Sequence, residues 1–249
     1  KKHGADCLRY WASSSSLGED LAYKEQDLKR ASIVIIKLWN SSRFISMFLK
    51  SDSKSTKKKL ELTDKWIFER LRKTQENYKN YFDEYEFSKA IKEAEVFFKH
   101  DFCDFYLEMI KYRLYGDDRK ESALYTLYHV LLEILKMFSP VLWWGANFWL
   151  IWKCSSAIGE KSINNLVFSE FKFDYSKAEK EIEKLIEIIK LIRDARQEMK
   201  IGFGKTIEKA ELHCSDVGKI KKLKKEIMGI GRIKNIEFKK IKGKEGKSL

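Results

Sequence analysis

Helix breakers and metal-ligand motifs are scarce in this chain, and each shortage excludes a class of protein. The 249 residues include one proline and 12 glycines, so long stretches lack breakers and a mostly helical fold is predicted. The four cysteines are scattered and form no C-x-x-C pair, which argues against a zinc site and a disulfide framework. We expect reduced thiols in a cytoplasmic protein. The four histidines also lack ligand spacing, so no metal site is predicted.

Local catalytic motifs are missing as well. The segment Gly202-Phe203-Gly204-Lys205 is too short, and lies in the wrong context, for a phosphate-binding loop. No Ser–His–Asp or Cys–His arrangement occurs at local motif spacing. The acidic pair Asp117-Asp118 follows a predicted helix end, where a solvated turn is the expectation. The sequence therefore describes a binding unit with no catalytic residues and no cofactor of its own.

Long apolar runs are limited to residues 137–152. This stretch is shorter than the ~20 residues that a membrane-spanning helix needs, and Pro140, Gly145 and Asn147 interrupt it. No signal peptide is visible, since Lys1 leads straight into Gly-Ala-Asp. The missing initiator methionine indicates a piece cut from something longer. We expect no membrane contact.

Apolar and basic side chains are abundant. Apolar residues make up 44% and aromatic residues 14% of the chain, enough to bury a sizeable core in one or two domains. The formal net charge is +13, and residues 219–249 hold twelve Lys or Arg against three acids, a net of +9. This basic tail fits either a polyanionic partner or a merely lysine-rich surface.

Apolar periodicity predicts a helical bundle followed by a small α/β appendage. A short helix over residues 6–16 is expected to be capped by Asp6, and a polar linker over 51–59 has nothing to bury. A second long helix, capped by Thr63 or Asp64, is predicted to bury a stripe that includes Trp66. The other long helices are expected over residues 25–49, 86–115, 121–138 and 175–200. Strands are predicted over 206–212 and 233–238, around a lysine-rich helix over 217–227.

Side-chain type indicates what such a bundle would bind. RNA loops are recognised by aromatic rings and guanidinium planes that stack on splayed bases. Trp39 and Arg43 lie four residues apart with Asn40 beside them, and Trp66 and Arg70 repeat that spacing. Core packing is the alternative for each tryptophan, and an ion pair or a phosphate contact is open for Arg43.

Several blocks resemble one family. They are Gly4–Trp11 (Gly-Ala-Asp-Cys-Leu-Arg-Tyr-Trp), Leu17–Asp20 (Leu-Gly-Glu-Asp), Lys37–Phe44 (Lys-Leu-Trp-Asn-Ser-Ser-Arg-Phe), Leu62–Ile67 (Leu-Thr-Asp-Lys-Trp-Ile) and Phe102–Glu108 (Phe-Cys-Asp-Phe-Tyr-Leu-Glu). In this order they resemble the carboxy-terminal, anticodon-binding region of class I valyl-tRNA synthetases of the archaeal and eukaryotic type. The resemblance is close over residues 1 to about 140 and thinner to about 240.

The resemblance implies a division of the chain into three parts. Residues 1–30 would be a stem-contact segment, 31–200 the anticodon-binding helical bundle, and 201–249 a small basic α/β appendage. The catalytic and editing domains of the same polypeptide would lie upstream. The full-length protein would be a valine–tRNA ligase that uses ATP and magnesium, whereas this fragment alone would be inactive and hold no cofactor. Its partner would be tRNA(Val), and we expect a monomer.

Two groups of residues are expected to contact the tRNA. The residues predicted to lie at the anticodon are Asn40, Arg43, Trp39, Trp66, Arg70, Glu108 and Lys111. The residues predicted to contact the stem are Arg9, Lys221, Lys222, Lys224 and Lys225. A buried network for Glu108 and a plain surface charge for Lys111 are the alternatives.

The chain departs from the family after Pro140. There the family continues with Pro-x-x-Thr-Glu-Glu, whereas residues 141–149 here contain neither acid. Two further interpretations stay open. The module could come from an isoleucyl or leucyl enzyme, against which the block Phe102–Glu108 speaks. It could also be a helical protein-interaction scaffold, with an exposed docking patch at Trp143, Trp144, Trp149 and Trp152.

Overall fold

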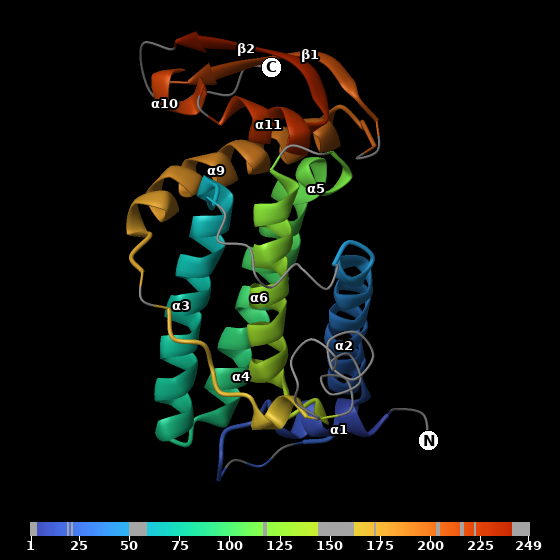
Figure 1. Cartoon of the computed structure of the whole chain (residues 1–249). Helices are drawn as coiled ribbons and strands as arrows, with labels where there is room; N and C mark the ends of the chain where they lie inside the picture. The colour runs from blue at the N-terminus through green and yellow to red at the C-terminus, as the bar shows by residue number, and fades with distance from the viewer. Residues whose placement is uncertain are drawn as a thin grey trace.

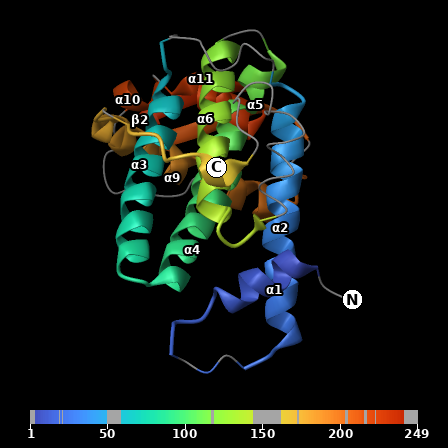
Figure 2. The same cartoon turned by 60° about the horizontal axis from the view of Figure 1, so that its bottom comes forward.

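Long helices standing side by side form the body of the molecule, α1 lies across one end of it, and a small α/β unit covers the opposite end (Figure 1). The computed structural model describes residues 4–18, 20, 22–49, 59–116, 119–143, 162–171, 173–202, 205–214, 217–221 and 223–240. The turned view shows α1 beside the end of α2 that points away from the α/β unit (Figure 2). The predicted fold, a mostly helical bundle with a small carboxy-terminal α/β appendage, is confirmed.

Each predicted long helix appears within a few residues of its expected bounds. The elements are α1 Ala5–Ala12, α2 Glu25–Ser46, α3 Leu62–Asp83, α4 Phe87–Val96, η2 Phe97–Tyr106, α5 Leu107–Tyr115, α6 Lys120–Phe138, η4 Ile163–Asn165, α9 Ser176–Glu198, β1 Ile207–Cys214, α10 Val217–Lys221, α11 Lys224–Gly231 and β2 Ile233–Lys240. The predicted linker over 51–59 lies outside the described residues except for its last position. Within the described ranges, no helix combines the length and apolar character needed to cross a bilayer.

Two predicted helix caps are wrong. The N-cap of α1 is Gly4, and Asp6 lies inside the first turn, where its charge faces the positive end of the helix dipole. The N-cap of α3 is Glu61, two to three residues before the expected Thr63 or Asp64. Asp64 instead completes a reciprocal capping box, since its carboxylate accepts a hydrogen bond from the Glu61 backbone N–H at 3.1 Å.

One predicted helix contains a wider turn at its centre. α4, η2 and α5 form a continuous helix as predicted, but residues 97–106 follow π-helical geometry, in which hydrogen bonds join residues five apart. Phe98 and Phe102 of η2 are fully buried. The side-chain pattern predicted the buried stripe of this helix, but it did not indicate the wider π-helical turns.

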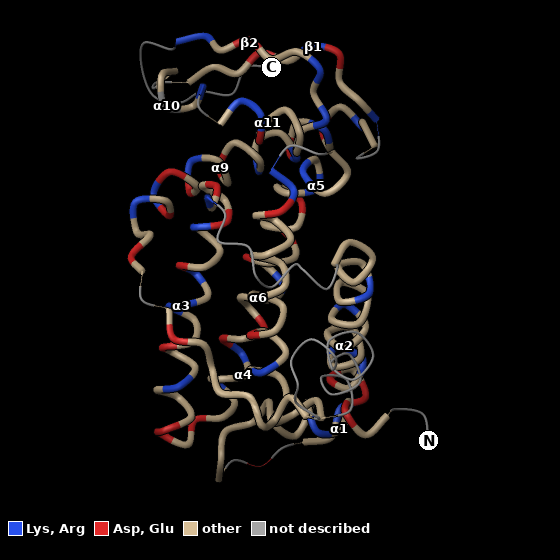
Figure 3. The backbone as a smooth tube through the Cα atoms, viewed as in Figure 1, with Lys and Arg blue, Asp and Glu red and all other residues tan. Residues whose placement is uncertain are grey.

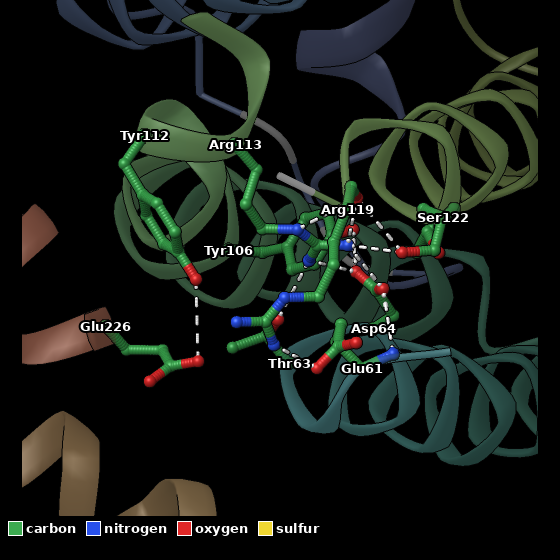
Figure 4. Close-up of polar contacts among 10 residues, drawn as sticks. Glu61, Thr63, Asp64, Tyr106, Tyr112, Arg113, Arg119, Ser122 and Glu226 are labelled. Atoms are coloured by element: carbon green, nitrogen blue, oxygen red, sulfur yellow. Dashed lines mark hydrogen bonds and ion pairs between the residues drawn. The ribbon is translucent and has the colours of Figure 1, made fainter. Parts of the chain in front are cut away.

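A buried ion pair joins the start of α3 to the end of α5 and the start of α6. Arg113 donates two hydrogen bonds of 2.8 Å to the carboxylate of Asp64, and the two side chains are 1% and 0% exposed (Figure 4). The Tyr106 hydroxyl donates to the same carboxylate at 2.8 Å, and Arg113 also donates to the Ser122 hydroxyl. An ion pair this deeply buried is stabilising only while the charged groups and their neighbours are all hydrogen-bonded.

An extended segment between η4 and α9 runs along the bundle (Figure 1). The ring of Phe168 lies 5.8 Å from that of Tyr78, and the ring of Phe171 lies 5.5 Å from that of Phe68. Buried Glu133 accepts hydrogen bonds from the Ser169 backbone N–H and hydroxyl. This segment therefore covers part of the bundle and connects η4 to α9.

The appendage consists of two parallel strands joined through α10 and α11. Ile207 of β1 pairs with Ile233 of β2, and the register continues to Cys214 and Lys240. The lysine-rich segment predicted as one helix is two short helices: α10 ends at Lys221 and α11 begins at Lys224. α11 packs on α5 and α9, so the appendage rests on the end of the bundle.

Candidate nucleic-acid interface

One face of α2 presents an aromatic ring, an amide and a guanidinium to solvent. Leu38 and Ile45 point into the core, which leaves Trp39, Asn40 and Arg43 exposed on the other side. Trp39 is 40% exposed. Within the described part of the chain, the Arg43 side chain has no hydrogen-bond or ion-pair partner, so its full set of donors is available. The structure thus brings together three of the residues predicted to lie at the anticodon.

A polar seam joins α2 to the π-helical segment η2. The Lys37 ammonium donates to the carboxylate of Asp104 at 2.9 Å, with both side chains partly exposed. Burial raises the pKa of the neighbouring Cys103 thiol to about 12. The thiol therefore stays protonated near neutral pH and packs as a small apolar side chain. This ion pair therefore marks the boundary between the exposed surface of α2 and that of η2.

A cleft of about 440 Å³ opens beyond this seam, where the bundle meets the appendage. Its lining brings four cations against two acids, with isoleucine walls between them. The lining residues are Cys103, Asp104, Glu108, Lys111, Ile189, Ile192, Arg193, Arg196, Ile230 and Arg232. The first four come from η2 and α5, and the next four come from α9. The last two are Ile230, at the end of α11, and Arg232, which connects α11 to β2. Such a cleft suits an anionic ligand that also has an apolar surface.

Glu108 and Lys111, both predicted site residues, lie on this cleft. They form an ion pair with each other across one turn of α5, with side chains 40% and 39% exposed. Opposite them, Arg193 donates to the backbone oxygen of Asp104 at 2.7 Å, and its guanidinium lies 5.5 Å from the centre of the Phe105 ring. Arg193 is therefore held in place by the fold.

Trp66 and Arg70 have structural roles instead. Trp66 is 1% exposed in the core, so no base can stack on it while the bundle is folded, and that prediction is wrong. Arg70 donates to Asp101 at 2.8 Å and to Glu179 at 3.4 Å, which ties α3 to η2 and α9. The spacing shared with Trp39 and Arg43 did not place the second pair on the same surface.

The residues predicted to contact the tRNA stem fall in two places. Arg9 donates to the backbone oxygens of Val141 and Pro140, both at 2.8 Å, which fastens α1 to the end of α6. Lys221, Lys224 and Lys225 are exposed on α10 and α11, where basic residues recur along the appendage (Figure 3). Lys222 lies outside the described residues, as do Trp144, Trp149 and Trp152 of the predicted docking patch. Stem contact by these residues stays a prediction.

Three cations of the cleft were missed by sequence reasoning. Arg193 and Arg232 carry no local signal. Arg196 does carry one, because it follows Ile189 and Ile192 at helical spacing on the apolar side of α9 and is 4% exposed. A charged residue in that register must find polar partners inside the fold. In the described ranges, no set of three or more His, Cys, Asp or Glu side chains gathers in a way that could hold a metal ion.

Comparison with known proteins shows the family. A domain family described as the anticodon-binding domain of tRNA ligase matches residues 64–212, more than half of the chain. The chain belongs to this family. The matched region runs from α3 through β1 and includes η2, α5 and most of the cleft.

The relatives of this family member include several proteins named valine–tRNA ligase. The protein from Methanocaldococcus jannaschii is 33% identical over 98% of this chain and 28% of its own length. The protein from Latilactobacillus sakei is 34% identical over 84% of this chain and 24% of its own. The protein from Wolbachia pipientis is 42% identical over 56% of this chain and 16% of its own. The chain thus spans less than a third of each of these relatives.

Proposed function

We propose that this chain is the module of a valine–tRNA ligase that binds the anticodon arm of tRNA(Val). Upstream domains of the same polypeptide would attach valine to the tRNA at the expense of ATP, with magnesium. The observation that carries the proposal is the exposed Trp39, Asn40 and Arg43 face of α2. The same helix pairs through Lys37 with Asp104 of a cationic cleft, in a chain of the anticodon-binding family. The module itself would need no cofactor, and we expect it to act in the cytoplasm within a monomeric enzyme.

The geometry suits a single-stranded RNA loop. An exposed indole offers a stacking surface worth roughly 1–3 kcal/mol per base. The planar fork of Arg43 can bind a base edge or a phosphate with two hydrogen bonds at once. The cleft adds depth that a flat helix face lacks, and its net positive charge attracts the RNA backbone.

The assignment to valine rests on the relatives and on the sequence blocks. All three relatives described above are named valine–tRNA ligase. The block Phe102–Glu108, which set the valyl family apart from its isoleucyl and leucyl relatives, supplies Cys103, Asp104 and Glu108 to the cleft. The residues that distinguish the family therefore lie where a ligand would be recognised.

A titration of the chain with tRNA(Val), and with the same tRNA carrying a changed anticodon, tests the proposal. We expect salt-sensitive binding that prefers the valine anticodon, since each phosphate contact adds to the salt dependence. Equal affinity for both RNAs would leave only a nonspecific basic surface. Absence of binding at low salt would favour the protein-interaction scaffold.

Arg43→Ala is expected to weaken tRNA(Val) binding about tenfold, since one arginine contact contributes roughly 1–3 kcal/mol. The thermal midpoint should not change, because no described residue pairs with this side chain. Fluorescence anisotropy and differential scanning calorimetry measure the two effects. Arg30→Ala removes an exposed arginine from the same helix and serves as the matched control. An equal loss of affinity in the control would assign the effect to net charge alone.

A further inference from the structure

The appendage supplies two of the residues that line the cationic cleft. Ile230 lies at the end of α11 and Arg232 connects α11 to β2, whereas the other lining residues belong to the bundle. A rotation of the appendage would withdraw one wall without altering either part internally. A device that fixes the orientation therefore controls whether the cleft is formed.

Arg196 of α9 bridges the two parts at this point. Its Nη1 donates to the backbone oxygen of Gly231 at 2.8 Å, between the two cleft residues contributed by the appendage. Its Nη2 donates to the backbone oxygens of Gly202, at 3.0 Å, and Lys205, in the loop that enters β1. One side chain thus holds the appendage at its entry and at its central turn.

The environment of Arg196 shows that this contact is specific. The side chain is 4% exposed, and no carboxylate in the described part of the chain pairs with it. Its buried Nε has no hydrogen-bond partner there. The hydrogen-bond acceptors of this guanidinium among the described residues are therefore backbone carbonyls, all of them at the junction. Burying a guanidinium in this way is a costly means of adhesion compared with an apolar contact, and it selects one arrangement of the partners.

Beside this contact, helix α11 packs closely against helix α5. A Cβ atom on Gly229 of α11 would lie 2.8 Å from the ring of Tyr112 on α5. The Tyr112 hydroxyl also reaches Glu226 of α11 at 3.5 Å (Figure 4). The apolar contact sets the distance between α11 and the bundle, and Arg196 sets the position of the turn that follows.

We propose that Arg196 is the positioning residue of the cleft. It locks the turn between α11 and β2 on the bundle, so that Ile230 and Arg232 meet Lys111 and Arg193 before any RNA arrives. The inference rests on the proposed RNA-binding function. A preformed cleft avoids the loss of affinity that follows when only a fraction of the molecules is competent to bind.

Residual dipolar couplings of the backbone amides in the whole, weakly aligned chain test the proposal, because they report the relative orientation of two rigid parts. In the native protein, amides of α3 and α6 should fit the same alignment tensor as those of β1 and β2. Arg196→Met should require two tensors, while hydrogen exchange shows that both strands keep their protection. Its affinity for tRNA(Val) should fall about tenfold, as when only a tenth of the molecules is competent.

Arg193→Met is the matched control. It removes a guanidinium from the same helix whose hydrogen bond and ring contact among the described residues are with the bundle. One tensor should therefore still fit, even though RNA affinity falls through the loss of a lining side chain. If Arg196→Met unfolds the strands, Arg196→Lys decides, because an ammonium keeps the charge and can bind part of the carbonyl set. The expected result is that the couplings of the bundle and of the appendage fail to fit one tensor in the native arrangement, with partial recovery of affinity.

A single unchanged tensor in the folded Arg196 variants would overturn the proposal. Two tensors with unaltered RNA affinity would overturn it as well, because the orientation would then have no effect on the cleft. Failure of the native chain to bind tRNA(Val) would instead refute the proposed function, and the dipolar couplings would still judge the role of Arg196 at the junction.

Discussion

Asp64→Ala is expected to lower the free energy of unfolding by about 3–5 kcal/mol, because removal of one partner leaves the other charge of a buried pair uncompensated. Arg113 is 1% exposed and would retain only the Thr63 and Ser122 hydroxyls and the backbone oxygen of Arg119. The Tyr106 hydroxyl would lose its acceptor as well. Urea unfolding followed by circular dichroism measures the loss.

Two companion variants make this test specific. Glu86→Ala removes a carboxylate whose ion pair with Lys89 is well exposed, and it should leave the unfolding midpoint nearly unchanged. The double variant Asp64→Leu with Arg113→Met replaces the buried pair by apolar side chains, and it should recover most of the stability. A double variant as unstable as Asp64→Ala would show that shape, rather than uncompensated charge, sets the cost.

Trp66→Ala and Trp39→Ala are expected to separate stability from binding. Trp66 is 1% exposed, and its truncation opens a cavity that costs about 3–5 kcal/mol. Trp39 is 40% exposed, so its truncation should lower the unfolding midpoint much less than that of Trp66. It should weaken tRNA(Val) binding roughly fivefold to a hundredfold, the range for loss of one stacked base.

Urea unfolding and anisotropy titrations on the same preparations measure both effects. The pair is well matched, because each tryptophan lies on a long helix four residues before an arginine. Retained RNA affinity in Trp39→Ala would remove the indole from the proposed interface. A midpoint unchanged by Trp66→Ala would contradict its place in the core.

Local periodicity predicted the helices and strands because each of them buries one face. The stripe that includes Ile182, Leu185 and Ile189 marked α9, and the change of pattern after Gly202 marked the appendage. The boundaries between structural units are harder to predict from periodicity. The predicted boundary at residue 30 falls inside α2, which runs unbroken from Glu25 to Ser46.

Side-chain partners far apart in the chain could not be predicted. Asp64 had a recognised local role near the start of α3, but its strongest contacts are with Arg113, 49 residues away. Trp39 and Trp66 have the same local pattern, and only tertiary packing around α3 buries the second. The partners of Arg196 are backbone oxygens, and because every residue has one, the sequence does not show which of them it contacts.

The π-helical turns of η2 set the rotational phase of everything that follows them in the same helix. Asp101 and Asp104, three residues apart, reach different neighbours there, Arg70 of α3 and Lys37 of α2. Deleting one residue within Phe97–Tyr106 would turn α5 by about 100° relative to α4. Glu108 and Lys111 would then leave the cleft, and Arg113 would leave Asp64. The rotation of α5 about its axis thus determines both the cleft and the buried ion pair. The length of this segment is therefore constrained more tightly than the identity of its surface residues.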